Sequence, residues 1–249
     1  MFNIGDRDHL RDRVLDMAAS DPRVVAGAAI GSLAHDQGDR WSDLDLMFAV
    51  ADDVPVVKVL EAWTETLVRE FRAVPLFDLP SEPITYRVFL VPDCLELDLS
   101  FTHTSEFRGS GATFRLLFGE VGEQPDEPPT PAQELFGYAV HHTLHARVAI
   151  ERGRYWQAEY WISALRDKAL AITCRRRGLD GWYGRDFDRL SAEVVDPFNE
   201  ALVRSLERDE LDRALGSAVA ALLRESAEAG EMVGKVEGQL RELASGSVG

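Results

Sequence analysis

The chain has few cysteines, no long hydrophobic run and a shortage of positive charge. Its two cysteines, Cys94 and Cys174, lie in unrelated contexts, so a cysteine-rich metal site is excluded and a structural disulfide is not expected. No apolar run reaches the ~20 residues that a membrane-spanning helix needs. The first residues are charged, unlike a signal peptide. We therefore expect a cytoplasmic protein that has no membrane partner.

Basic residues are outnumbered: 27 Lys and Arg face 43 Asp and Glu, which gives a formal net charge of −16 over 249 residues. Such a chain lacks the basic surface that binds nucleic acid phosphates, so nucleic acid is not an expected partner. An acidic surface would instead attract a cationic small molecule. Because many cytosolic proteins are acidic, the charge favours such a ligand only modestly.

The most informative segment begins with an apolar run that ends in glycine and serine. Residues 24–30 are short and apolar, which predicts a buried strand. Gly31 allows a sharp turn and the close approach of a ligand. If a short helix begins near Leu33, its free N–H groups and Ser32 suit a phosphate. A Gly-Ser pair alone is more often an ordinary turn.

A second predicted strand, 43–50, carries two acidic residues on one face. Asp43 and Asp45 alternate with Leu44 and Leu46, so the carboxylates point away from the predicted core. Two carboxylates so close repel each other unless a cation lies between them. Mg²⁺ suits this position, because it prefers carboxylate, water and phosphate oxygens.

A third predicted strand, 95–101, repeats the pattern. Leu97 and Leu99 share one face, while Glu96, Asp98 and Ser100 share the other. If this strand lies beside the strand at 43–50, Asp98 completes a cluster of three carboxylates. Taken alone, Asp98 is also compatible with a solvated position on a half-exposed strand.

The ordered combination of Gly31-Ser32, Asp43-Leu44-Asp45 and Leu97-Asp98-Leu99 resembles the nucleotidyltransferase superfamily with the DNA polymerase β-like fold. The chain looks most similar to small bacterial aminoglycoside and lincosamide nucleotidyltransferases, in which such a domain precedes a helical bundle. The motifs cover about residues 10–105, and the remainder matches by architecture alone.

The resemblance implies an enzyme that transfers a nucleoside monophosphate, AMP from ATP or another nucleotide, to a hydroxyl of a small cationic acceptor such as an aminoglycoside. Pyrophosphate would be released. Asp43, Asp45 and Asp98 would hold two Mg²⁺ ions, and Asp98 would also help to deprotonate the acceptor. Gly31 and Ser32 would contact the nucleotide. Some relatives complete the site with a second subunit, so a homodimer is possible.

The fold class that we predict is α+β, with a mixed-sheet domain followed by an all-α bundle. Four prolines within 123–134 predict a linker, because they continue neither helix nor sheet. We expect a catalytic domain over 1–124, a linker over 125–131 and a bundle over 132–249. The expected strands are 24–30, 43–50, 84–91, 95–101 and 113–119; the expected helices are 8–19, 55–72, 132–152, 155–177, 196–208, 210–224 and 228–243.

Three residues of the helical half are further candidates for substrate contact. Glu159 could bind a substrate ammonium group, and Arg166 or Lys168 a phosphate, since related enzymes use their helical domain in this way. The alternative is a solvated or ion-paired helix face, and the sequence favours neither. Arg108 and Arg115 flank Gly109-Ser110-Gly111, for which a plain surface loop is favoured over a flexible rim of the cleft.

Histidines and aromatic residues are also concentrated in the helical half. His141 and His145 share a helix face at a spacing that can bind a metal, with His142 beside them. No further ligand is evident, so core or cleft histidines are favoured over zinc. A nearby aromatic group is expected to be mostly core, with one ring available to stack on adenine; it comprises Tyr155, Trp156, Tyr160 and Trp161.

Two other functions remain open from the sequence. A nucleotidyltransferase of the toxin–antitoxin type would modify a protein or an RNA. A non-catalytic module, such as a degenerate copy of the enzyme, would keep the fold and bind a nucleotide without turnover.

Overall fold

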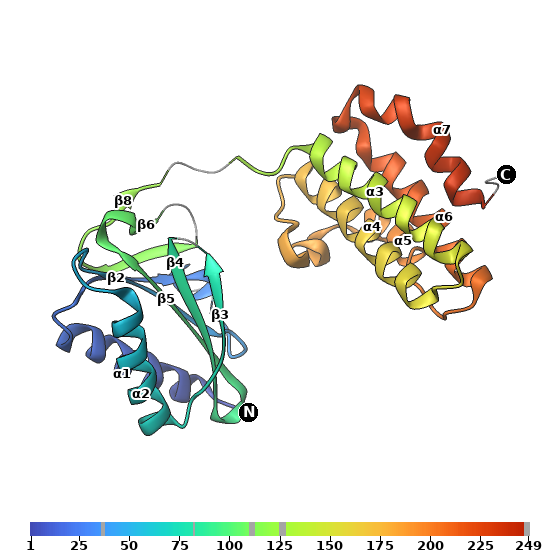
Figure 1. Cartoon of the computed structure of the whole chain (residues 1–249). Helices are drawn as coiled ribbons and strands as arrows, with labels where there is room; N and C mark the ends of the chain where they lie inside the picture. The colour runs from blue at the N-terminus through green and yellow to red at the C-terminus, as the bar shows by residue number, and fades with distance from the viewer. Residues whose placement is uncertain (36–37, 82, 110–112, 125–127, 247–249) are drawn as a thin grey trace. The chain divides into compact units, whose positions relative to one another are not determined.

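The computed structural model describes residues 1–35, 38–81, 83–109, 113–124 and 128–246. The chain forms two compact units, Met1–Glu127 and Pro128–Gly249 (Figure 1). The boundary between them falls inside the proline-rich segment. Each unit buries a hydrophobic core of its own.

A six-stranded mixed sheet forms the centre of the first unit, with strand order β3-β4-β5-β2-β1-β7. The β2–β5 pair is parallel, and the other neighbouring pairs are antiparallel. The two-residue strands β6 and β8 form a separate pair. The strands are β1 (Val24–Ile30), β2 (Leu44–Val50), β3 (Val74–Ser81), β4 (Ile84–Val91), β5 (Leu95–His103), β6 (Arg108–Gly109), β7 (Phe114–Phe118) and β8 (Gly122–Glu123).

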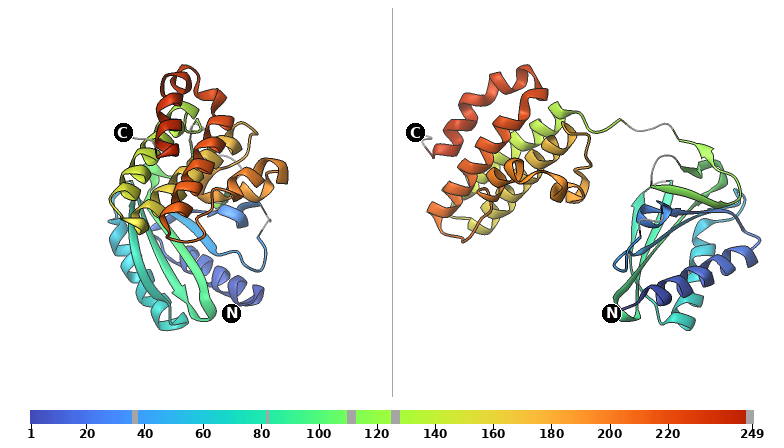
Figure 2. Two further views of the ribbon diagram at one scale, coloured as in Figure 1. Left: turned by 90° about the vertical axis from the view of Figure 1, so that its right-hand side faces the viewer. Right: turned by 180° about the vertical axis from the view of Figure 1, so that it is seen from behind.

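Helices α1 (Ile4–Ser20) and α2 (Val56–Phe71) cover one face of this sheet (Figures 1 and 2). The alternation of β2 and β5 places one set of apolar side chains against the helices. This core includes Leu46, Phe48 and Leu99 from the strands and Trp63 from α2. The opposite face of the same strands therefore carries their polar residues.

The predicted fold class is confirmed, and every predicted strand is present with its ends shifted by at most two residues. Helix α1 begins four residues earlier than expected. Its cap is Asn3, whose side chain accepts from the Asp6 amide while the Asp6 carboxylate accepts from the Asn3 amide. This reciprocal cap satisfies amide groups that otherwise lack partners at a helix start.

Strand β3 was not predicted. Its Pro75 and Pro80 cannot donate a hydrogen bond, which argues against a central strand. The structure places β3 at the edge of the sheet, where only β4 is a neighbour. At an edge, half of the backbone groups need no strand partner, so the prolines are tolerated.

The second unit is helical, as predicted. Helix pairs pack around a core that includes Phe136, Ile162, Leu165 and Leu215. Its helices are α3 (Ala132–Glu151), α4 (Tyr155–Arg175), α5 (Ala192–Asn199), α6 (Arg208–Glu225) and α7 (Glu231–Ser245). Short 3₁₀ helices complete the described chain: η1 (Gly31–His35), η2 (Pro92–Cys94), η3 (Thr104–Glu106), η4 (Trp182–Gly184), η5 (Phe187–Arg189) and η6 (Ser226–Ala229).

The helix predicted over 196–208 is wrong. Helix α5 ends at Asn199, two residues after Pro197, and the next helix begins only at Arg208. Proline inside a helix removes a backbone donor and crowds the preceding turn. The Arg213 side chain then binds the carbonyl groups of Glu200 and Leu202, which stabilises a non-helical connection.

Two further expectations concern cysteines and membranes. Cys94 and Cys174 are both free. Among the helices of the described ranges, none combines the length and the apolar character that crossing a membrane requires.

Candidate metal and nucleotide site

Asp43, Asp45 and Asp98 meet on the face of the sheet that α1 and α2 do not cover, which we call the open face. One carboxylate oxygen of each lies within 4.8 Å of the others. The parallel pairing of β2 with β5 sets Asp45 directly opposite Asp98, and Asp43 immediately precedes β2. Asp98 is buried, with 6% of its surface exposed. The cluster that the sequence predicted on one side of the sheet is therefore present.

Gly31 borders this cluster at the end of β1. Its φ of +68° lies in the left-handed region that favours glycine. A Cβ atom at this position would lie 2.7 Å from Asp45 Oδ2, so a side chain would collide with the carboxylate. The Gly31 amide donates to the Thr113 carbonyl over 2.9 Å. Gly31 thus provides close approach, while its own N–H group is already bonded within the protein.

The 3₁₀ helix η1 begins at Gly31 itself, two residues before the expected position at Leu33. Ser32, which follows Gly31, is exposed. Its hydroxyl is therefore accessible to a ligand that contacts the turn.

Burial and mutual repulsion dominate the electrostatics of the cluster. Burial, followed by the negative charges of Asp43 and Asp98, raises the pKa of Asp45 to about 8. Burial also raises the pKa of Asp98, with a further increase from Asp43 and an opposing hydrogen bond from Tyr86. A divalent cation between these groups would favour their charged forms.

The oxygen atoms of the cluster suit a hard cation such as Mg²⁺. The Oδ1 atom of Asp98 is buried and has no hydrogen-bond partner among the residues that the structure describes. A buried charged oxygen without a partner is costly. A metal ion is the kind of partner that would satisfy it.

Tyr86 is a site residue that the sequence interpretation missed. Its hydroxyl donates a short hydrogen bond to Asp98 Oδ2. Burial and this contact raise the pKa of Tyr86. The turn at Pro92–Cys94 sets Val91 opposite Leu95, which places Tyr86 opposite Ser100, next to Asp98 on the same face. Counting this register from the turn is the signal that could have identified Tyr86.

Glu96 adds a fourth carboxylate near the cluster. It occupies the same face of β5 as Asp98, two residues earlier, and is exposed. Partial burial and the charges of Asp98 and Asp43 raise its pKa. The open face is therefore strongly negative around the three aspartates.

Arg7 is a second residue that the sequence did not suggest. It is 4% exposed and has no acidic partner within the described ranges. Its guanidinium donates to the carbonyl groups of Asp39 and Ser42 over 2.6 and 3.1 Å. Asp43 follows Ser42 directly, so Arg7 holds the segment that leads into the carboxylate cluster.

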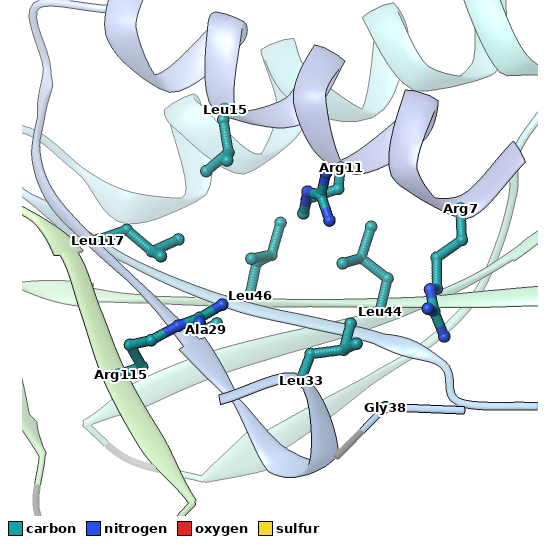
Figure 3. Close-up of a pocket in the computed structure, with 10 residues that line it drawn as sticks. All are labelled: Arg7, Arg11, Leu15, Ala29, Leu33, Gly38, Leu44, Leu46, Arg115 and Leu117. Atoms are coloured by element: carbon teal, nitrogen blue, oxygen red, sulfur yellow. The ribbon is translucent and has the colours of Figure 1, made fainter. Parts of the chain in front are cut away.

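Arg7 also lines a cavity of about 320 Å³ between α1 and the helix-covered face of the sheet (Figure 3). Arg11 comes from the same helix and Arg115 from β7, while leucine side chains form most of the remaining wall. Among these, Leu44 and Leu46 alternate with Asp45 along β2. The cavity and the carboxylates therefore belong to opposite faces of one strand.

The candidates of the helical half lie on α4 in the second unit and are not part of the carboxylate cluster. Glu159 accepts a hydrogen bond of 2.8 Å from Ser163. Arg166 forms an ion pair of 3.3 Å with Asp167, and the Lys168 ammonium lies 5.4 Å from the Tyr138 ring centre. These contacts occur on one helix or between neighbouring helices, and the three proposed substrate roles stay predictions.

The three histidines His141, His142 and His145 lie around Trp161 and do not form a metal site with another ligand in the described residues. Ring centres of His141 and His145 are 4.3 Å apart, and His145 stacks on Trp161 at 4.8 Å. In the described part of the chain, the three aspartates form the only group of at least three side chains placed to share a metal ion. A core position is wrong for His141 and His145, which are exposed. The three histidine rings instead pack against Trp161.

The expectation that the aromatic group is mostly core is wrong for two of its members. Trp156 and Tyr160 are 78% and 61% exposed, because they fall on the outer face of α4, whereas Tyr155 and Trp161 pack against the core. The plain loop expected around Arg108 and Arg115 is wrong for both arginines, since Arg108 begins β6 and Arg115 lies in β7. Arg108 donates to the Ser105 carbonyl of η3. Residues 110 and 111 of the Gly-Ser-Gly segment lie outside the described residues.

Comparison with solved structures gives likenesses at the level of the fold. No protein-family model matches the chain, and no curated protein matches it either. A crystal structure of an aminoglycoside 6-adenyltransferase from Bacillus subtilis aligns over 96% of this chain and 97% of its own, with 13% identity and a TM-score of 0.41. That protein is a nucleotidyltransferase by name. At this identity and score, the assignment of an activity depends on the residues of the chain itself.

Proposed function

We propose that the chain is a metal-dependent nucleotidyltransferase that transfers a nucleoside monophosphate, AMP from ATP, to a hydroxyl group. The observation that carries the proposal is the meeting of Asp43, Asp45 and Asp98 beside the Gly31 turn. The order of these motifs along the chain supports it. Carboxylates placed in this way serve to hold cations against a triphosphate.

Asp43, Asp45 and Asp98 would hold Mg²⁺, two ions by the resemblance of the motifs. When bound, the metal would neutralise charge on the triphosphate and on the leaving pyrophosphate. The raised pKa values of Asp45 and Asp98 agree with this role, because a cation would remove the cost of ionising carboxyl groups that are so close together.

The chain's own residues would orient the nucleotide and accept a proton. Gly31 leaves space beside Asp45, and the Ser32 hydroxyl can donate to a phosphate oxygen. The acceptor oxygen attacks the α-phosphorus, the bond to pyrophosphate breaks, and the hydroxyl proton passes to Asp98 as general base. The products are the nucleotidylated acceptor and pyrophosphate.

A cationic acceptor suits the surroundings of the site. Glu96 places an exposed carboxylate on the face that carries Asp98, and the chain has a net charge of −16. Such a surface raises the local concentration of cations and speeds their encounter. An aminoglycoside-like compound, which carries several ammonium groups among its hydroxyls, is the acceptor class that we propose.

The proposal is tested by measuring pyrophosphate release with four nucleoside triphosphates against aminoglycosides, lincosamides and cell extracts. We expect release with Mg²⁺, ATP and a cationic acceptor, and a loss of at least about 100-fold in Asp45→Asn. Asp53→Asn, which changes an exposed aspartate in a turn, is the matched control. Release that survives Asp45→Asn would reject the metal role.

The same screen separates the other functions. Release only with the macromolecular fraction of an extract, and not with its small molecules, would indicate a macromolecular acceptor. Binding of Mg²⁺ and ATP with no release under any condition would indicate a non-catalytic module.

A further inference from the structure

Asp98 has two oxygen atoms in different surroundings. Oδ2 accepts the hydrogen bond from the Tyr86 hydroxyl. Oδ1 is buried and has no hydrogen-bond partner in the described part of the chain. The side chain as a whole is more than nine-tenths buried. The Tyr86 hydroxyl thus holds one oxygen, while the other is closed to solvent and has no such donor.

Tyr86 reaches Asp98 from a neighbouring strand. Antiparallel pairing of β4 with β5 sets Tyr86 opposite Ser100, and Val88 opposite Asp98. Tyr86 is therefore a diagonal neighbour of Asp98 on the open face, within reach for a long aromatic side chain. Its ring is half-buried, which restricts the directions from which its hydroxyl can donate.

We propose that Tyr86 is a positioning residue for the carboxylate cluster, which orients Asp98 so that Oδ1 serves as the metal ligand. The proposal rests on the function proposed above and adds a residue to it. A hydrogen bond to a ligating carboxylate fixes its rotation, and loss of such a bond typically lowers metal affinity about 10- to 100-fold. Asp45 shares a hydrogen bond with Asp98 only while one of the two carboxyl groups carries a proton. When both are charged to hold a metal, the Tyr86 hydroxyl is the donor that would still orient Asp98.

The experiment is a titration of the full-length protein with Mn²⁺, without nucleotide, followed by electron paramagnetic resonance. We expect Tyr86→Phe to weaken Mn²⁺ binding about 10-fold or more. Tyr183→Phe removes the hydroxyl of a tyrosine that is 88% exposed and should leave the affinity unchanged. Replacing Tyr86 by p-aminophenylalanine, which keeps a donor at the ring tip, should restore most of the affinity.

A purely structural role would give a different result. In that case, Tyr86→Phe would lower the urea midpoint in EDTA while Mn²⁺ affinity stayed at the wild-type value, and this outcome would overturn the proposal. If Tyr86→Phe does not fold, O-methyltyrosine at position 86 is titrated instead. It cannot donate a hydrogen bond, so wild-type affinity in that variant would also overturn the proposal.

The same titration distinguishes failure of the proposed metal site from failure of the role of Tyr86. If the wild-type protein binds Mn²⁺ and Asp45→Asn does not, the site stands and the Tyr86 variants decide the positioning role. If the wild-type protein and Asp45→Asn bind Mn²⁺ equally, the proposed function fails, and the role of Tyr86 fails with it.

Discussion

Asp45 lies at the centre of the carboxylate cluster and has neighbours on both sides. It lies opposite Asp98 across the parallel strand pair, and its Oδ2 occupies the space that a side chain at position 31 would need. Its carboxyl group also has the pKa that burial and its acidic neighbours raise to about 8. The charged carboxylate of Asp45 should therefore destabilise the metal-free protein, although metal binding requires it.

The first prediction concerns Asp45→Asn in EDTA. The pKa of Asp45 rises from 3.8 in the unfolded chain to about 8 in the folded protein. Between these values the folded protein binds more protons, so the free energy of unfolding falls as pH rises. Asparagine removes this penalty. We expect the variant to be more stable than wild type at pH 8, on the order of 5 kcal/mol, with the difference shrinking towards pH 4.

Urea unfolding of the two proteins in EDTA at several pH values measures this difference. Saturating Mg²⁺ should reverse the order at pH 8, because the metal stabilises only the protein that binds it. A variant that is less stable than wild type in EDTA at pH 8 would contradict the repulsion inferred for the cluster.

The second prediction concerns Gly31→Ala. Alanine at a φ of +68° costs about 1–2 kcal/mol, and its Cβ would displace the Asp45 carboxylate. We expect lower stability together with weaker Mn²⁺ binding, measured by urea unfolding and by titration. Gly137→Ala is the control: its site has nothing within 4 Å of an added Cβ and lies inside α3, so stability should rise slightly. Unchanged Mn²⁺ affinity in Gly31→Ala would show that Gly31 does not shape the site.

Spacing and alternation were sufficient to predict the cluster residues. Asp43, Asp45 and Asp98 follow from a period of two on strands whose other face is leucine. Tyr86 and Arg7 could not be found in this way. Tyr86 depends on the register of a hairpin, and Arg7 acts through the backbone of a loop whose conformation the sequence does not specify.

At the scale of elements, α1 is joined to the segment before β2 by one buried side chain. Arg7 on α1 donates to the carbonyl groups of Asp39 and Ser42. Within the same segment, Asp39 Oδ1 accepts from the Trp41 amide and the Ser42 hydroxyl, which forms a compact turn. The position of Asp43 therefore depends on a helix that is remote from the carboxylates in the sequence.

The third prediction follows from this connection. Arg7→Met should destabilise the first unit by about 1–3 kcal/mol, because two carbonyl groups lose their donor, and should weaken Mn²⁺ binding through Asp43. Arg11→Met is the control, since Arg11 lies on the same helix and pairs with the partly exposed Asp8 and Asp12. Urea unfolding and Mn²⁺ titration measure both effects. Normal Mn²⁺ affinity in Arg7→Met would limit Arg7 to a role in stability.

The elements that the sequence failed to predict share a cause. Prolines in β3 argue against a strand, yet an edge position tolerates them. Pro197 was placed within an extended helix over 196–208, but α5 ends soon after it and Arg213 stabilises the connection that follows. In both cases, tertiary neighbours decide what local propensity leaves open.

At the scale of the whole molecule, the two units are the main feature. The first contains the sheet, the carboxylates and the Gly31 turn, and the second contains a helical core of its own. The candidate acceptor and phosphate contacts, Glu159, Arg166 and Lys168, belong to the second unit. Metal binding and substrate selection would therefore be carried by different parts of the chain.

The fourth prediction separates these parts. A fragment of residues 1–124 should fold and bind Mn²⁺ with nearly the affinity of the full chain, while residues 128–249 should fold without binding it at the carboxylate site. Circular dichroism and Mn²⁺ titration of each fragment check this. A folded first fragment with no Mn²⁺ affinity would show that the second unit supplies an essential ligand.

The most direct test of the central claim is a crystal structure with Mn²⁺ and a non-hydrolysable ATP analogue, using anomalous scattering to locate the metal. We predict anomalous density bounded by Asp43, Asp45 and Asp98, with the triphosphate at the Gly31-Ser32 turn. Anomalous density at another place, or a nucleotide bound away from this turn, would contradict the proposed site.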